Sequence, residues 1–184
     1  MPLINHWETE LSASTIRTAN FDDLAFRQAL GRFATGVAIV TTADPKTQQP
    51  LGLTISSFNS VSMTPPLVLW SLQSSSSLLD TFLQVERYNI HILSAEQMML
   101  ALHFSRGTQE ERFSQIDFTY NDFGIPKLPE FYSAAYFECY NKTQYHEGDH
   151  HIMIAQVERC SHSGYMPLVF HAGTFELTPQ PSKK

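Results

Sequence analysis

Residues 37–72, VAIVTTADPKTQQPLGLTISSFNSVSMTPPLVLWSL, contain three short segments that decide the fold. VAIVTT (37–42), LGLTISSF (51–58) and PLVLWSL (66–72) are rich in branched and aromatic residues, a composition typical of strands. The connections between them, DPKTQQP and SMTPP, have the proline-containing, polar character of turns. This region therefore predicts three strands joined by turns.

Strands are also expected in the rest of the chain. YNIHIL (88–93) has strand composition, and the last third predicts strands over 133–146, 150–162 and 168–177, the first two joined by a tight turn at residues 147–149. Strands at both ends and few helices argue against a doubly wound sheet. They favour an antiparallel barrel with helices packed outside.

Helical spacing of apolar residues predicts helices over 22–34, 78–84 and 95–104. Gly36 suits the end of the first helix, and Ser94 with Gln97 suits a capping box at the start of the third. Residues 105–130 are expected to form a long loop, because the segment is charged at first and then carries Gly124 and two prolines.

The bulk properties exclude several classes of protein. A chain of 184 residues fits one domain, predicted at 21–178 between an extension (1–20) and a tail (179–184). The net charge is −6 and the basic residues are scattered, so no nucleic-acid partner is expected. No apolar run reaches membrane-spanning length, and residues 1–20 do not resemble a secretory signal. We therefore expect a cytoplasmic protein that does not enter membranes.

Hydroxyl residues gather where the second strand ends and the third begins. Thr54, Ser56, Ser57 and Ser62 could bond the pyrimidine edge of a flavin, which alternates acceptors and donors. Such residues more often satisfy their own backbone in turns, and composition alone favours that structural role.

A second candidate is the run Gln73 to Ser77, directly before the predicted helix at 78–84. Hydroxyls and free N–H groups at a helix start suit a phosphate, whereas a simple cap would need only one serine. Both interpretations remain open. Because the run contains no basic residue, a phosphate would need charge from Arg106 or Arg112.

The remaining motif searches argue against other chemistry. His150 and His151 follow Gly148 and Asp149, and strand alternation would send the two imidazoles to opposite faces. No ligand spacing supports a metal site. Neither a nucleophile elbow nor a G-x-G-x-x-G fingerprint occurs, so a hydrolase or a Rossmann domain is not expected.

Taken together, several stretches resemble the flavin reductase family, which has the FMN-binding split-barrel fold and includes the reductase components of two-component flavin monooxygenases. The resemblance covers about residues 21–177 and is carried by these stretches in order: FRQALGRFATGVAIVTT, GLTISSFNSVSMTPPLVLWSLQSSSS, GDHHIMIAQVE and LVFHAGTFEL.

The resemblance implies a mainly β protein: a six-stranded antiparallel split β-barrel with peripheral helices, usually a homodimer, with FMN or FAD in a groove near the subunit interface. It implies that Thr54, Ser56, Ser57 and Phe58 contact the isoalloxazine and ribityl portions. The phosphate would be held by Ser71, Ser74, Ser75 and Ser77. Arg106, from the long loop, is our own choice for the added charge and is not implied by the resemblance. His150 is assigned to nicotinamide positioning.

The expected activity is therefore hydride transfer from NADH or NADPH to the flavin, with reduced flavin passing to a partner oxygenase component. Because the two cofactors carry the chemistry, no acid–base dyad is required. Two alternatives remain: a split-barrel flavoprotein with another redox substrate, resembling pyridoxamine phosphate oxidases, and a flavin-binding protein without turnover.

Overall fold

The computed structural model describes residues 18–129 and 133–178. The predicted tail (179–184) and most of the predicted extension (1–20) lie outside the described residues. Within the described ranges, no helix is long and apolar enough to cross a membrane.

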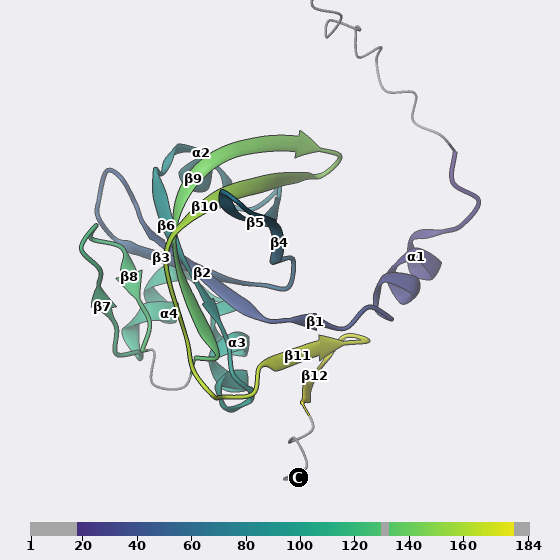
Figure 1. Ribbon diagram of the computed structural model, residues 1–184. Helices are drawn as coiled ribbons and strands as arrows, with labels where there is room; N and C mark the ends of the chain where they lie inside the picture. Colours follow the sequence, from purple (N-terminus) through teal and green to yellow (C-terminus); the bar gives the residue numbers. More distant parts are fainter. Residues whose placement is uncertain (1–17, 130–132, 179–184) are drawn as a thin grey trace, which may run out of the picture.

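The fold is organised around one antiparallel sheet of seven strands that curls into an incompletely closed barrel (Figure 1). Its strands, in the spatial order β3-β2-β6-β9-β10-β5-β4, are β3 (Pro50–Ile55), β2 (Ala38–Ala43), β6 (Arg87–Ile92), β9 (Ala135–Glu147), β10 (His150–His162), β5 (Pro66–Gln73) and β4 (Asn59–Met63). The prediction of a mainly β split barrel is confirmed. The seventh strand is β4, which the sequence did not predict and which pairs with the start of β5.

A small second sheet lies beside the barrel. It contains β1 (Thr35–Gly36), β11 (Leu168–His171) and β12 (Thr174–Leu177), in the order β1-β11-β12. The predicted strand over 168–177 is thus a hairpin, because Ala172 and Gly173 both adopt positive φ and turn the chain.

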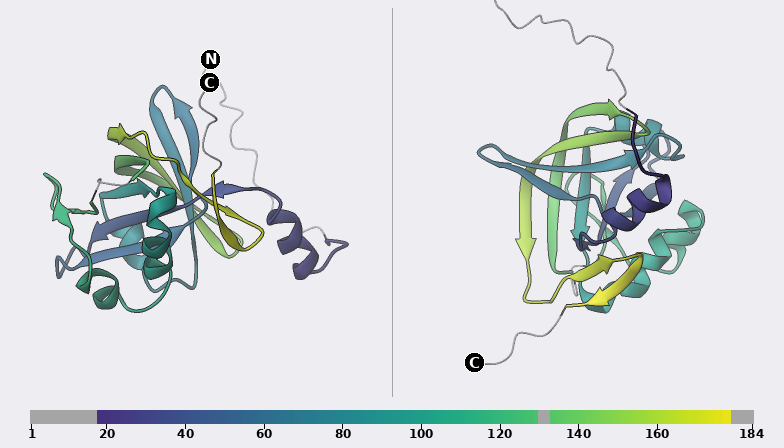
Figure 2. Two further views of the ribbon diagram at one scale, coloured as in Figure 1. Left: turned by 90° about the horizontal axis from the view of Figure 1, so that it is seen from below. Right: turned by 90° about the vertical axis from the view of Figure 1, so that its right-hand side faces the viewer.

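Helix α1 (Asp23–Leu30) projects away from the barrel beside the β11–β12 hairpin (Figures 1 and 2). Asp22 caps its first turn by accepting from the amide of Ala25. Gly31 follows its last residue, so the prediction that Gly36 ends this helix is wrong. Gly36 instead belongs to β1, where it pairs with Val169.

The interior of the barrel is filled mainly by aromatic and branched side chains. Along β5, Val68, Trp70 and Leu72 are buried, and the residues between them face the other side, as the two-residue period of a strand requires. The Trp70 ring packs edge-on against Phe82, which comes from α2 (Leu79–Gln84), with ring centroids 5.1 Å apart. This alternation directs Ser71 out of the core.

The segment 105–130 is not the predicted loop. A helical turn η1 (Ala95–Gln97) leads into α3 (Met98–Phe104), and α4 (Gln109–Ser114) follows after a short turn. Two short strands come next, β7 (Thr119–Tyr120) and β8 (Pro126–Lys127). The start of α4 is fixed by a reciprocal capping box between Thr108 and Glu111. The capping interaction predicted for Ser94 is present, with Gln97 Oε1 accepting from its amide.

Helix α4 also covers the outer edge of the sheet at β3. The amide of Gly52 donates to Gln109 Oε1 at 2.7 Å, and the Gly52 carbonyl accepts from Arg112 Nη1 at 2.6 Å. A Cβ on Gly52 would lie 2.8 Å from the ring of Phe104, so only glycine allows this close approach. The edge strand is thereby supplied with hydrogen-bond partners that a neighbouring strand would otherwise provide.

Candidate functional site

A groove of about 500 Å³ lies between the end of β3 and the end of β5. Its walls come from these two strands, the link after β3, the serine turn after β5 and the start of β10. The lining residues are Leu53, Thr54, Ile55, Ser56, Ser57, Ser71, Leu72, Gln73, Ser75, Ser76, Ser77 and His150. Most of the residues predicted to bind the cofactor are therefore brought together.

Ser57 joins the two walls of the groove. Strand β4 pairs with β5 only from Pro66 to Leu69, so Ser71 lies beyond that ladder. There the Ser57 hydroxyl accepts from the amide of Ser71 at 3.0 Å and donates to its carbonyl at 3.2 Å. Since both hydrogen-bonding capacities are used inside the protein, Ser57 shapes the groove rather than offering a free donor to it.

Two other predicted ligands are also engaged by the protein. Thr54 Oγ1 donates to the carbonyl of Ala101 in α3 at 2.7 Å, which leaves only its acceptor lone pairs. Phe58 does not line the groove. Its ring packs against Phe137, with centroids 5.5 Å apart, at the margin of the barrel core.

The serine turn is held from the side of β10. The amide of Ser74 donates to the carbonyl of Asp149 at 2.8 Å, and Ser76 Oγ accepts from the amide of Leu78 at 3.3 Å. No serine side chain caps α2, which begins at Leu79 and has six residues, so the predicted helix-start anion site is not formed by that helix. The hydroxyls of Ser75 and Ser77 line the groove and have no partner among the described residues.

The basic residue next to the serine turn is Arg112, whereas the sequence pointed to Arg106. A second hollow of about 250 Å³ shares Ser76, Ser77 and Thr54 with the groove and also contains Arg112. Besides Gly52, the Arg112 side chain bonds the carbonyl of Arg106 at 3.1 Å. Burial lowers its pKa, and no carboxylate among the described residues pairs with it. A half-buried cation of this kind suits an anionic group.

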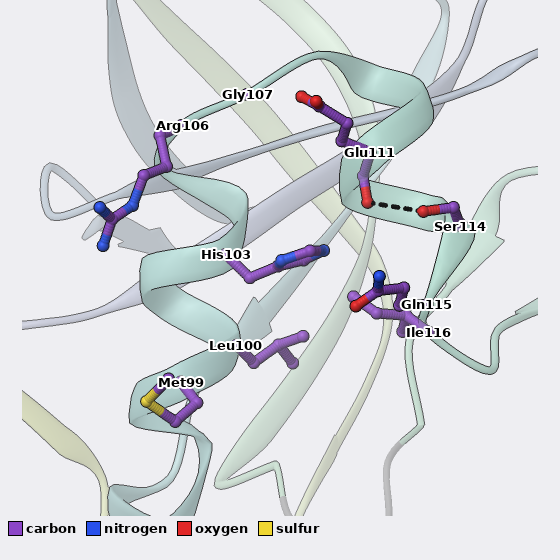
Figure 3. A pocket seen from close by; sticks show the side chains of 9 residues that line it. All are labelled: Met99, Leu100, His103, Arg106, Gly107, Glu111, Ser114, Gln115 and Ile116. Atoms are coloured by element: carbon purple, nitrogen blue, oxygen red, sulfur yellow. Dashed lines mark hydrogen bonds between the residues drawn. The ribbon is translucent and has the colours of Figure 1, made fainter.

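Arg106, the other basic residue predicted for the phosphate, does not line the groove. It lines a separate hollow of about 630 Å³ between α3 and α4, together with His103 and Glu111 (Figure 3). Figure 3 shows the Arg106 side chain extending from the end of α3 on the side away from Glu111. The Glu111 carboxylate accepts a hydrogen bond from the Thr108 amide and is therefore engaged in the cap of α4. The hollow lies at the corner between α3 and α4, apart from the groove.

The β9–β10 hairpin places His150 in the groove. Glu147 and His150 pair across a two-residue turn in which Gly148 has a φ of 60°, a value that glycine adopts without strain. His151 lies on the opposite face, where its ring stacks on His146 with centroids 4.6 Å apart. The predicted separation of the two imidazoles is confirmed.

The groove suits a flat heteroaromatic ring with a phosphate tail. Leu53 provides partly exposed apolar surface, and the largely buried Ile55 and Leu72 also reach the wall. Ser75, Ser77 and the neighbouring Arg112 provide polar groups without an acidic partner among the described residues. Such a combination of apolar wall and few polar groups is usual for cofactor sites. Within the described residues, no cluster of three or more His, Cys, Asp or Glu side chains could hold a metal.

Fold and groove together define a split-barrel flavoprotein. Residues 30–178 match the family described as "Flavin reductase like domain". The chain belongs to this family.

Known proteins agree with this assignment. The chain is 42% identical over 151 residues to the FMN reductase (NADH) SmoA of Agrobacterium fabrum, covering 82% of this chain and 83% of that protein. It is 35% identical to the reductase component of the flavin-dependent trigonelline monooxygenase of Acinetobacter baylyi, covering 85% of this chain but only 49% of that longer relative. The solved structure of the Streptomyces globisporus NADH:FAD oxidoreductase SgcE6, in complex with NAD and FAD fragments, superposes with a TM-score of 0.81 at 26% identity, covering 91% and 99% of the two chains.

Proposed function

We propose that this protein is an NADH-dependent flavin reductase that binds FMN or FAD in the groove between β3 and β5. The net reaction is NADH plus a proton plus oxidised flavin, giving NAD⁺ and reduced flavin. The flavin and the nicotinamide supply the hydride chemistry when both are bound, so the protein must orient two rings and exclude water. The observation that carries the proposal is the groove itself, lined by hydroxyls, apolar surface and His150.

The isoalloxazine ring is assigned to the part of the groove lined by Leu53, whose wall the largely buried Ile55 and Leu72 also reach. Ser56 and the Ser71 hydroxyl supply donors for its carbonyl edge, and Thr54 Oγ1 is an acceptor because its hydrogen is used by Ala101. Ser57 keeps β3 and β5 at the spacing that this ring needs.

The flavin phosphate is assigned to Ser75, Ser77 and Arg112. The two hydroxyls have no partner among the described residues, and the Arg112 cation has no carboxylate beside it. A charge-assisted bond to the phosphate would stabilise both partners. Ser74 contributes indirectly, since its amide anchors the turn to Asp149, and Arg106 takes no part.

His150 is assigned to the nicotinamide. It enters the groove from the start of β10, next to the serine turn, and is paired with Gln73 in β5. This position favours contact with a second ring placed over the flavin, and His150 acts there by orientation.

A second copy of the chain is proposed as the cover for α1. Five apolar side chains in and beside this helix, Phe21, Leu24, Phe26, Leu30 and Phe33, are each at least 50% exposed, and no residue of α1 is buried. Apolar surface of this extent commonly marks an interface. The proposed homodimer works in the cytoplasm and passes reduced flavin to a separate oxygenase component.

The proposal is tested by mixing the purified protein with NADH or NADPH and with riboflavin, FMN or FAD in turn, and following the loss of nicotinamide absorbance. Continuous oxidation with catalytic amounts of protein is expected. Flavin binding without turnover with any pair would contradict the proposal and favour the flavin-storage alternative. Turnover with a pyridoxal substrate instead would favour the oxidase alternative.

A further inference from the structure

Asp149 lies in a turn whose position is fixed from two sides. The turn closes the β9–β10 hairpin, with His150 paired to Glu147 in β9 and to Gln73 in β5. The Asp149 carbonyl accepts from the Ser74 amide at 2.8 Å. The backbone that carries the Asp149 carboxylate is therefore anchored to the same serine turn that lines the groove.

The Asp149 carboxylate contacts the groove histidine directly. Its Oδ1 lies 2.7 Å from His150 Nδ1, and the hydrogen bond from His150 lowers the pKa of Asp149. An ionised carboxylate can only accept, so Nδ1 must carry the proton. In the neutral imidazole the lone pair then lies on Nε2, for which no partner occurs among the described residues.

We propose that Asp149 is a positioning residue for the reductase reaction: it fixes the ring orientation and tautomer of His150 so that Nε2 faces the nicotinamide as a hydrogen-bond acceptor. The inference rests on the proposed function, which places the nicotinamide beside His150. The carboxamide of a nicotinamide carries an NH₂ donor that such an acceptor would bind. Without Asp149, the ring could rotate or present Nε2–H, which would oppose that donor.

Among the side chains around His150, Asp149 is the one placed to fix the orientation and tautomer of its ring. Strand β5 and the serine turn contribute uncharged side chains, Gln73 and Ser75 to Ser77. Glu147 is the other carboxylate next to the turn, and its side chain makes no hydrogen bond or ion pair with His150. His151 and His146 stack together on the opposite face. The Asp149 carboxylate is 80% exposed, so its removal should not affect folding.

The test compares Asp149→Ala, Asp149→Asn, His150→Ala and the double variant Asp149→Ala/His150→Ala in the full chain. We measure the KM for NADH, kcat, and the Kd for FMN by flavin fluorescence. Asp149→Ala should raise the KM for NADH about three- to fivefold, as expected for the loss of one modest hydrogen bond, with the Kd for FMN unchanged. Asp149→Asn keeps an acceptor oxygen and should restore most of the wild-type KM. Glu147→Gln, the matched control on the same turn, should leave the KM unchanged.

The double variant separates positioning from a direct role. If Asp149 acts through His150, the double variant should match His150→Ala, because the contribution of one residue vanishes without the other. A further rise in KM in the double variant, or no rescue by asparagine, would overturn the inference. A weaker Kd for FMN in Asp149→Ala would also overturn it. If the wild-type protein oxidises no NADH with any flavin, the proposed function is wrong. If the wild-type protein is active but the effects of the two substitutions on KM add up in the double variant, only the inference about Asp149 is wrong.

Discussion

The hydroxyl of Ser57 takes the place of a neighbouring strand beside Ser71, accepting from its amide at 3.0 Å and donating to its carbonyl at 3.2 Å. This pair of bonds lies where β4 has already left β5. It connects the two walls of the proposed flavin groove at the point where no strand pairing joins them.

Replacement of Ser57 by alanine should therefore cost stability. The change leaves the amide and carbonyl of Ser71 without their partner, a loss of about 1–3 kcal/mol in the free energy of unfolding, measured by urea denaturation. The neighbouring Ser56→Ala is the control, because Ser56 is exposed and makes no recorded bond. Unchanged stability with weaker flavin binding would mean that the Ser57 hydroxyl contacts the flavin instead.

Gly52→Ala tests the covered edge of β3. The added methyl group would meet the Phe104 ring at 2.8 Å, and overpacking of this kind costs about 1–3 kcal/mol. Gly36→Ala is the matched control, because no atom lies within 4 Å of a Cβ built there. Thermal unfolding of the two variants should separate them clearly. Equal melting temperatures would show that the Phe104 ring at the end of α3 moves away from β3 at little cost.

Arg112→Gln tests the phosphate assignment. Affinity for FMN should fall about tenfold or more, as expected for the loss of a charge-assisted hydrogen bond. Affinity for riboflavin, which lacks the phosphate, should change much less. The ratio of the two dissociation constants is the readout, because loss of the bond to Gly52 can weaken both. Arg106→Gln should leave the ratio unchanged, and the reverse result would restore Arg106 as the phosphate ligand.

Stability should fall in mild acid because of His91. Burial, with a smaller effect from the charge of Lys127, lowers the pKa of His91 to about 3, whereas the unfolded chain has an ordinary value of about 6.5. Between these values the unfolded state binds more protons, so stability present above about pH 6.5 is lost as the pH falls, by up to about 1.4 kcal/mol per pH unit.

Urea denaturation between pH 7 and pH 5 measures this slope. The window lies above the range in which Asp44, Glu111 and Asp149, whose pKa values are lowered, begin to titrate. His91→Gln should be less stable at pH 7, because His91 Nε2 bonds Thr41 Oγ1 at 3.3 Å in the interior. Its stability should nevertheless change less across the window. An equally steep slope would assign the acid sensitivity to other groups.

Substitution of the α1 surface tests the proposed dimer. Leu24→Ser with Phe26→Ser removes two exposed apolar side chains of this helix. Sedimentation should show the wild-type protein as a dimer and the variant as a weaker dimer or a monomer. Both the wild-type protein and the variant keep Leu102, which lies in α3 and is not part of the α1 surface. A monomeric wild-type protein at micromolar concentration would contradict the proposal.

The strands could be predicted from the sequence, because branched and aromatic residues and the two-residue alternation of buried and exposed positions are typical of strands. The turn at Gly148 and the opposite facing of His150 and His151 also followed from local rules. The segment 105–130 did not, although Thr108 and Glu111 carried the capping-box spacing that marks α4. Its charged composition hid a helix that has only one buried residue, Phe113.

The site itself was predictable in position but less so in roles. Thr54, Ser57 and Ser71 meet in one groove, yet the sequence could not reveal that two of these hydroxyls are consumed by distant carbonyls, those of Ala101 and Ser71. The choice between Arg106 and Arg112 depended on the direction of the chain between α3 and α4. That direction is a tertiary property, which residue spacing does not determine.

The split between β3 and β5 has a consequence for the lifetime of the protein. A molecule held by both walls adds contacts between them, and by mass action it stabilises the fold by about 2.7 kcal/mol at a hundredfold excess over its Kd. We expect the folded population to rise and fall with the free flavin pool. A cell short of flavin would then clear this protein by proteolysis sooner than a well-supplied one, so the abundance of the reductase would follow the supply of the molecule that it reduces.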